Sequence, residues 1–141
     1  MNSYQLVYPM FVMVALSFVV LSKLFLIRLK SIKEGEVDAK FYKAYQVAVE
    51  PNKLVQLSRQ FVNLFEARVL FYAACIAAMV IGISETLFLV MAWVYVLMRL
   101  VHTFIHTGNN KTWFRVCSYF VSWVVLLAMW VLLMIRVSEL D

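Results

Sequence analysis

The chain has 141 residues, of which 65% are hydrophobic, and its formal net charge is +5. This composition is too apolar for a water-soluble domain of this size, which excludes a soluble globular protein. Four apolar stretches are each long enough to cross a hydrocarbon core of about 30 Å. In chain order they are Gln5–Ile27, Phe61–Ile83, Thr86–His106 and Val116–Arg136. They predict an all-α membrane protein with a single domain over residues 1–141, in which loops 28–60 and 107–115 lie on one side.

The basic residues gather in two of the connecting segments. The segment between the first two spans holds Arg28, Lys30, Lys33, Lys40, Lys43, Lys53 and Arg59, and the link before the fourth span holds Lys111 and Arg115. The N-terminal tail and the turn near Ser84 hold none. By the positive-inside rule, both basic loops are expected in the cytoplasm and both termini outside it. The positive charge is therefore interpreted as a topology signal that also suits contact with anionic lipids, and no nucleic-acid partner is expected.

Two rows of polar residues lie inside these apolar spans. The first row has the spacing i, i+4, i+7 and consists of Arg59, Asn63 and Glu66. The second has the spacing i, i+3, i+7 and consists of Arg99, His102 and His106. Each row falls within an arc of about 60° on its helix. Because a charge at mid-bilayer costs roughly 2.5–3.5 kcal/mol, these side chains must face protein or a wet cavity, which indicates a functional site.

The two rows are predicted to lie at matching depth. A very short turn joins the second and third spans, so these helices are expected to be antiparallel neighbours. Counting from their cytoplasmic ends, Glu66 and His102 lie roughly 8 Å inside and Arg99 roughly 12 Å inside. Arg115, at the start of the fourth span, is expected at the mouth of the same cluster, with Tyr119 one turn below it. The polar groups therefore converge at the cytoplasmic end of the bundle.

Both rows resemble helix signatures of the MAPEG superfamily, the membrane-associated proteins in eicosanoid and glutathione metabolism. The row on the second span resembles that superfamily's second-helix signature in the form Arg59-x3-Asn63-x2-Glu66. The row on the third span resembles its third-helix signature in the form Arg99-x2-His102-x3-His106, followed by Arg115 and Tyr119. The resemblance covers the whole chain and is nearest to bacterial members of the superfamily.

The resemblance implies a homotrimeric bundle in the bacterial inner membrane, with glutathione held between adjacent subunits near the cytoplasmic face. The implied activity is that of a glutathione-dependent transferase or peroxidase acting on a lipophilic electrophile. Carried over residue by residue, the resemblance makes Arg115 the catalytic group that stabilises the thiolate. The residues that would bind glutathione are Arg59, Asn63, Glu66, Arg99, His102, His106 and Tyr119.

The chemistry of these side chains suits glutathione, which carries two carboxylates, one ammonium and a thiol. Arg59 and Arg99 can each hold a carboxylate through a bidentate fork. Glu66 can accept the ammonium, and Asn63 can hydrogen-bond the peptide. A positive charge such as that of Arg115 lowers a thiol pKa from its usual value of about 8.5, which favours the nucleophilic thiolate.

The sequence departs from the family pattern at several positions. His106 stands where a tyrosine is usual, and Val116 follows Arg115 where some relatives carry a serine. Arg68 and Leu70 lie near positions where proline is common. Arg68 also points away from the polar row on its own helix, at about 180° from its first member. It therefore requires another partner: a neighbouring helix, a second subunit or a lipid phosphate.

Three other interpretations of the polar rows stay open. A non-catalytic membrane module would bind a lipid, a small anionic ligand or a partner helix in the same cavity. Glu66 and Arg99 would alternatively form an ion pair that only fixes the helix register. His102 and His106 would alternatively ligate a metal or a haem, although no recognisable metal motif accompanies them.

Overall fold

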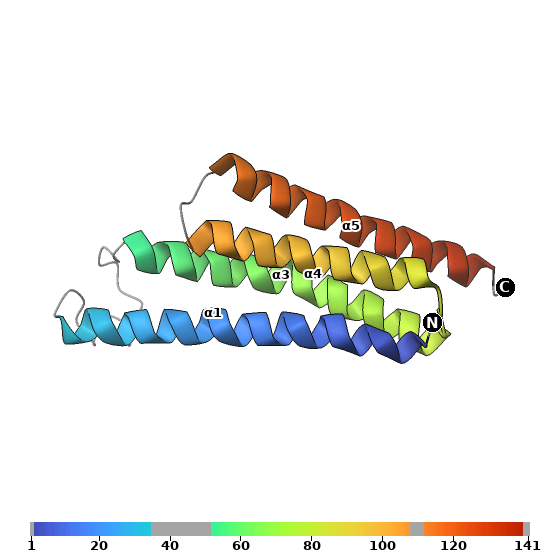
Figure 1. Cartoon of the computed structure of the whole chain (residues 1–141), viewed down its shortest axis with the longest axis horizontal. Coiled ribbons are helices and arrows are strands. Elements are labelled where there is room, and N and C mark those ends of the chain that lie inside the picture. The colour runs from blue at the N-terminus through green and yellow to red at the C-terminus, as the bar shows by residue number, and fades with distance from the viewer. Residues whose placement is uncertain (1, 35–51, 108–111, 140–141) are drawn as a thin grey trace.

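The computed structural model describes residues 2–34, 52–107 and 112–139, with side chains over 2–34, 67–105 and 113–139. A 3-10 turn, η1 (Ser3–Leu6), leads into α1 (Val7–Lys33). The helices that follow are α3 (Asn52–Ile81), α4 (Thr86–Thr107) and α5 (Thr112–Ser138) (Figure 1). The predicted all-α, four-helix fold is confirmed for this part of the chain.

The ends of the helices follow from local sequence. The Asn2 side chain accepts a hydrogen bond from the Tyr4 amide at 3.2 Å and so caps η1. Pro9 lies in the first turn of α1, where its missing N–H has no helical partner to lose. α3 stops at Gly82, which adopts φ +80°. The Gly82 and Ile83 amides donate to the carbonyls of Met79 (3.2 Å) and Ala78 (2.9 Å), which is the Schellman arrangement.

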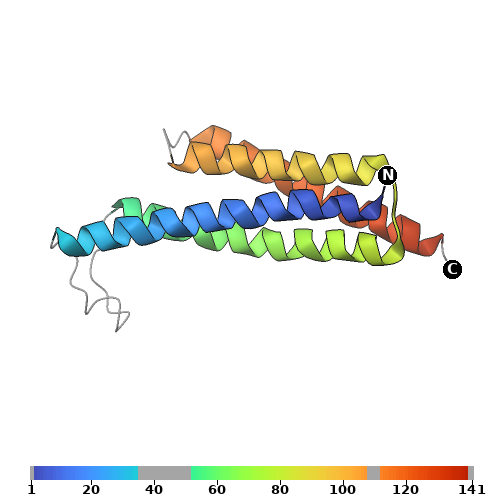
Figure 2. The ribbon, with the colours of Figure 1, turned by 60° about the horizontal axis from the view of Figure 1, so that its bottom comes forward.

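The helices form an up-and-down bundle whose ends are distinct. α3 and α4 lie between α1 and α5, and both chain termini lie at one end (Figure 1). At the other end of the bundle, α1 and α4 end and α3 and α5 begin (Figures 1 and 2). α4 packs most extensively against α5, and α1 packs mainly against α3. The pair α4 and α5 is thus the most closely packed pair of helices in the described structure.

Buried residues recur every three or four positions along each helix, so each presents one stripe to the interior. On α1 the stripe is Pro9, Met13, Leu16, Val20 and Leu24. On α3 it consists mainly of small residues, Ala67, Phe71, Ala74, Cys75 and Ala78. Small residues let helix backbones approach closely within a membrane. Cys75 is a buried free thiol and Cys117 an exposed one.

The outward faces of the helices are apolar, as a lipid environment requires. Phe11, Phe18, Phe104 and Phe120 are among the large hydrophobic side chains that stay exposed. In the described residues, three helical stretches are long and apolar enough to cross a membrane, Ser3–Lys33, Thr86–Ile105 and Trp113–Ser138. α3 contributes the shorter apolar stretch Ala67–Ile81. The chain is therefore an integral membrane protein.

An ion cluster fastens α5 at the end of the bundle that carries the termini. Arg136, near the end of α5, forms salt bridges with Glu85 and Glu139. Glu85 belongs to the turn between α3 and α4, so the cluster ties α5 to that turn. All three side chains are partly exposed, so these pairs contribute little to the stability of the bundle.

Candidate functional site

Four of the residues predicted from the sequence meet where α4 ends and α5 begins. α4 contributes Arg99 and His102, which its spacing i, i+3 places on one face. α5 contributes Arg115 and Tyr119, at i, i+4 in its first two turns. Arg99 and His102 are almost fully buried, with exposed fractions of 1% and 4%. Arg99 and His102 thus face the bundle interior, toward α5.

The imidazole of His102 is hydrogen-bonded to the backbone of α5. Its Nδ1 lies 3.1 Å from the carbonyl oxygen of Arg115. Because a carbonyl oxygen only accepts, this contact assigns the ring hydrogen to Nδ1 and leaves Nε2 as the acceptor nitrogen. The Ser118 hydroxyl donates to the same carbonyl at 3.0 Å and lies 3.4 Å from Nδ1.

The guanidinium of Arg99 lies between two phenol rings. Its Cζ is 5.1 Å from the ring centroid of Tyr119 and 5.4 Å from that of Tyr95. The Tyr95 ring is stacked on Phe71 of α3, with centroids 4.4 Å apart and planes 13° apart. Cation–π contacts of this kind attract a cation to the ring face and are strongest where water is excluded. Three helices therefore cooperate to place the Arg99 charge.

Arg99 has no carboxylate partner among the side chains that the structure describes. Its Nε, Nη1 and Nη2 atoms are all buried, and no hydrogen bond of good geometry reaches them from those residues. Tyr95 interacts with the guanidinium through its ring and electrostatically. Removing an unpaired charge from water costs several kcal/mol, so a buried guanidinium requires an anion nearby.

A cavity of about 290 Å³ opens beside this cluster, and its described lining consists of His102, Arg115, Val116 and Tyr119. The volume is near the lower end of the range of about 300–1,000 Å³ that is typical of ligand pockets. The lining combines an imidazole, a guanidinium and a phenol with the isopropyl group of Val116. This lining suits a ligand that is anionic at one end and apolar at the other.

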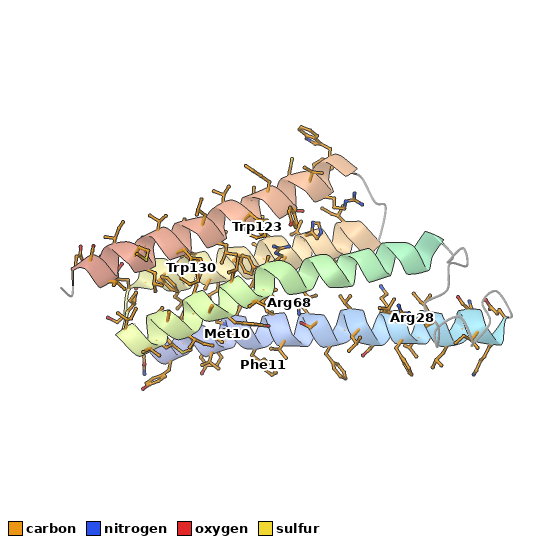
Figure 3. The ribbon with its side chains drawn as sticks, turned by 180° about the vertical axis from the view of Figure 1, so that it is seen from behind. Met10, Phe11, Arg28, Arg68, Trp123 and Trp130 are labelled. Atoms are coloured by element: carbon orange, nitrogen blue, oxygen red, sulfur yellow. The ribbon has the colours of Figure 1, made fainter. Side chains whose placement is uncertain are left out.

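Aromatic side chains continue from the cavity into the core. The Tyr119 ring lies 5.7 Å from the His102 ring and 6.3 Å from the Trp123 ring, centroid to centroid. Trp123 and Trp130 extend from the inner side of α5 and pack against the hydrophobic core (Figure 3). Tyr119 is thus held between a rigid core and the cavity.

Arg68 has its partner on a neighbouring helix. It is 3% exposed, and its Nη1 donates to the carbonyl oxygen of Met13 at 3.4 Å. Figure 3 shows Arg68 between α3 and α1, on the side of α3 that α1 covers. Of the three partners that the sequence left open, the structure therefore gives one, the backbone of α1.

Four other predicted site residues have side chains outside the described residues. Arg59, Asn63 and Glu66 lie on α3, and His106 lies in the last turn of α4. Their predicted ligand contacts, and the alternative Glu66–Arg99 pair, stay predictions. Among the described side chains, no group of three or more His, Cys, Asp or Glu residues is placed to hold a metal ion.

Ser118 and Tyr95 belong to the cluster although sequence reasoning missed them. Tyr95 lies at i−4 from Arg99, and Ser118 lies at i+3 from Arg115, so both share a helix face with a predicted residue. That periodicity was a usable signal for each. Their contacts across helices also depend on how α4 rotates against α5 and α3, which the sequence pattern does not set.

Comparison with known proteins decides the family. The MAPEG family model matches residues 6–135, which is nearly the whole chain. The chain belongs to the MAPEG family. The match includes every residue of the cavity lining and of the predicted site. No curated protein and no solved structure matches the chain. MAPEG membership makes it a membrane protein of the glutathione and eicosanoid metabolism superfamily.

Proposed function

We propose that this MAPEG protein is a glutathione-dependent transferase or peroxidase that acts on a lipophilic electrophile at the cytoplasmic side of a bacterial inner membrane. The observation that carries the proposal is the cavity between α4 and α5, which brings Arg115, His102 and Tyr119 together beside apolar Val116. Arg99, which is buried against the Tyr119 ring without a carboxylate among the described side chains, adds a second cation.

The donor set fits an anionic thiol. Glutathione carries two carboxylates, one ammonium and a thiol, so it is a net anion at neutral pH. The described lining of the cavity offers a guanidinium, an imidazole and a phenol and contains no carboxylate. Such a lining suits anions, because its one charged group, Arg115, is a cation and the Tyr119 hydroxyl can donate a hydrogen bond. The Arg115 charge would repel a cationic ligand.

Arg115 is assigned the catalytic role. A guanidinium near the ligand sulfur lowers the pKa of the thiol, because the positive charge favours the anionic form. The thiolate is the reactive nucleophile, and its lone pair forms the new bond to the electrophile while the leaving group departs with the bonding pair. Arg115 keeps its charge throughout, since a guanidinium is not deprotonated in proteins. Val116 and the exposed Phe120 provide an apolar approach from the lipid.

The rest of the site is proposed to come from α3, α4 and an adjacent subunit. Arg59, Asn63 and Glu66 are assigned to glutathione binding because they match the family signature. His106 is assigned to it because it stands at the signature position where a tyrosine is usual. One chain offers a cavity of about 290 Å³, which is small for a tripeptide and a lipophilic substrate together. A homotrimer would complete the cavity between subunits. In this arrangement residues 1–141 form one membrane domain, with loops 28–60 and 107–115 in the cytoplasm and both termini outside it.

The proposal is tested by calorimetric titration of glutathione into the detergent-purified protein, followed by a panel of lipophilic electrophiles and hydroperoxides. Millimolar or tighter binding with turnover is expected, and Arg115→Ala should lose turnover while largely keeping binding. The matched control is Arg136→Ala, which removes an arginine from the far end of α5 and should leave both quantities unchanged. Absence of binding at millimolar glutathione would contradict the proposal. Binding without any thiol chemistry would instead support the non-catalytic module.

A further inference from the structure

The carbonyl oxygen of Arg115 receives side-chain donors from two helices. His102 approaches from α4, with Nδ1 at 3.1 Å, and Ser118 approaches from the next turn of α5, with Oγ at 3.0 Å. The two donors are themselves 3.4 Å apart, and both side chains are buried. A backbone carbonyl in the first turn of a helix is therefore held to a second helix by a small polar cluster.

Ser118 differs from the other buried serine on the same face of α5. Ser122, one turn deeper, also bonds back to the carbonyl three residues before it, that of Tyr119, at 2.6 Å. Such back-bonds are common for serines in helices and carry no special role alone. No contact between Ser122 and a histidine is among the interactions described for α4 and α5, whereas Ser118 shares its acceptor with His102. The distinguishing feature of Ser118 is this shared acceptor.

We propose that Ser118 is a positioning residue for Arg115, an inference that rests on the proposed function of the cavity. The Ser118 hydroxyl and the His102 imidazole fix the Arg115 carbonyl against α4. The Arg115 side chain branches from the Cα atom that is bonded to this carbonyl carbon. A fixed carbonyl therefore fixes the position from which the guanidinium extends toward the cavity. The Ser118 oxygen beside Nδ1 also favours the tautomer in which Nδ1 carries the hydrogen. Ser118 itself is outside the cavity lining and acts through Arg115 and His102.

The kinetic test compares Ser118→Ala, Ser118→Thr and Ser122→Ala in the purified full-length protein, with glutathione and an aryl chloride that loses chloride when the thiolate attacks. Ser118→Ala should lower kcat by about tenfold, which is about 1.4 kcal/mol in the barrier, and leave KM for glutathione within about twofold, because Ser118 affects the position of Arg115 and not ligand contact. Ser118→Thr keeps the hydroxyl and should restore kcat. Ser122→Ala should retain wild-type kcat.

A second measurement needs no glutathione. Cys117 is an exposed free thiol between Arg115 and Ser118, and Cys75 is buried, so a nitroxide spin label attaches in the first turns of α5. Its spectrum should show greater mobility in Ser118→Ala than in the wild type, and no change in Ser122→Ala. Unchanged mobility in Ser118→Ala, or an equal kcat loss in Ser122→Ala, would overturn the inference. If the wild-type protein showed no turnover with glutathione, only the proposed function would be refuted. The spin label would still report whether Ser118 and His102 hold the Arg115 carbonyl in place.

Discussion

Substitutions at Tyr119 separate two roles of its side chain: the ring stabilises the fold, and the hydroxyl binds glutathione. The contacts of the ring allow the energy of the first role to be worked out. The Tyr119 ring lies against the buried Arg99 guanidinium at 5.1 Å and against the rings of His102 and Trp123. A desolvated cation–π contact is worth about 2 kcal/mol, and each aromatic pair about 0.5–1.5 kcal/mol. Tyr119→Leu keeps part of the packing, so we expect a loss of about 2–3 kcal/mol. Tyr119→Phe keeps the ring and should cost less than about 1 kcal/mol.

The assay is thermal unfolding in one detergent at one scan rate, followed by glutathione titration. A loss of about 2–3 kcal/mol corresponds to a fall of roughly 5–10 °C in the unfolding midpoint for a chain of this size. Tyr119→Phe should nearly keep the midpoint yet bind glutathione about 2–10-fold more weakly, because a hydroxyl hydrogen bond is worth about 0.5–1.5 kcal/mol. Phe120→Leu, on the exposed face of α5, is the control. Equal midpoints for Tyr119→Leu and Phe120→Leu would refute the stabilising contact with Arg99.

Two further predictions concern the far end of the bundle. Arg136→Ala removes the salt bridges to Glu85 and Glu139, and it should lower the unfolding midpoint only slightly, since these side chains are partly exposed. Comparing midpoints of variant and wild type in low and high salt checks this, because the difference should shrink as salt screens the pairs. Gly82→Ala places a Cβ in open space but at φ +80°, so only backbone strain of about 1–2 kcal/mol is expected. A Gly82→Ala midpoint equal to that of the wild type would contradict the strain estimate.

The helices, and the meeting of Arg99, His102, Arg115 and Tyr119, were readable from the sequence for a physical reason. Apolar length reports membrane crossing, and the spacing of Arg99 with His102, and of Arg115 with Tyr119, fixes each pair on one helix face. An apolar stretch marks the part of a helix that lies within the bilayer. It does not mark where the backbone hydrogen bonds of the helix end. α1 continues to Lys33, well past its apolar run, and ends with basic residues that suit a helix C-terminus.

The contacts between helices were not readable in the same way. The bond from Arg68 to the Met13 carbonyl depends on α1 packing beside that face of α3, and nothing in the local pattern selects α1. The Tyr119 ring against Arg99 and the His102 imidazole at the Arg115 carbonyl depend on how α4 and α5 are rotated against each other. The spacing of residues along the sequence predicts which of them share a helix face. The packing of whole helices determines which residues that face contacts.

The central claim is that Arg115 holds glutathione as a thiolate in the cavity between α4 and α5. The most direct measurement is the ultraviolet absorbance of the bound thiolate as a function of pH, for the wild type and for Arg115→Gln. Because a positive charge favours the anion, the wild type should show thiolate at a pH well below that of free glutathione, whose thiol has a pKa of about 8.5 or slightly above. In Arg115→Gln the absorbance should appear only near the pH of the free thiol. A bound thiol that titrates identically in the two proteins would contradict the claim.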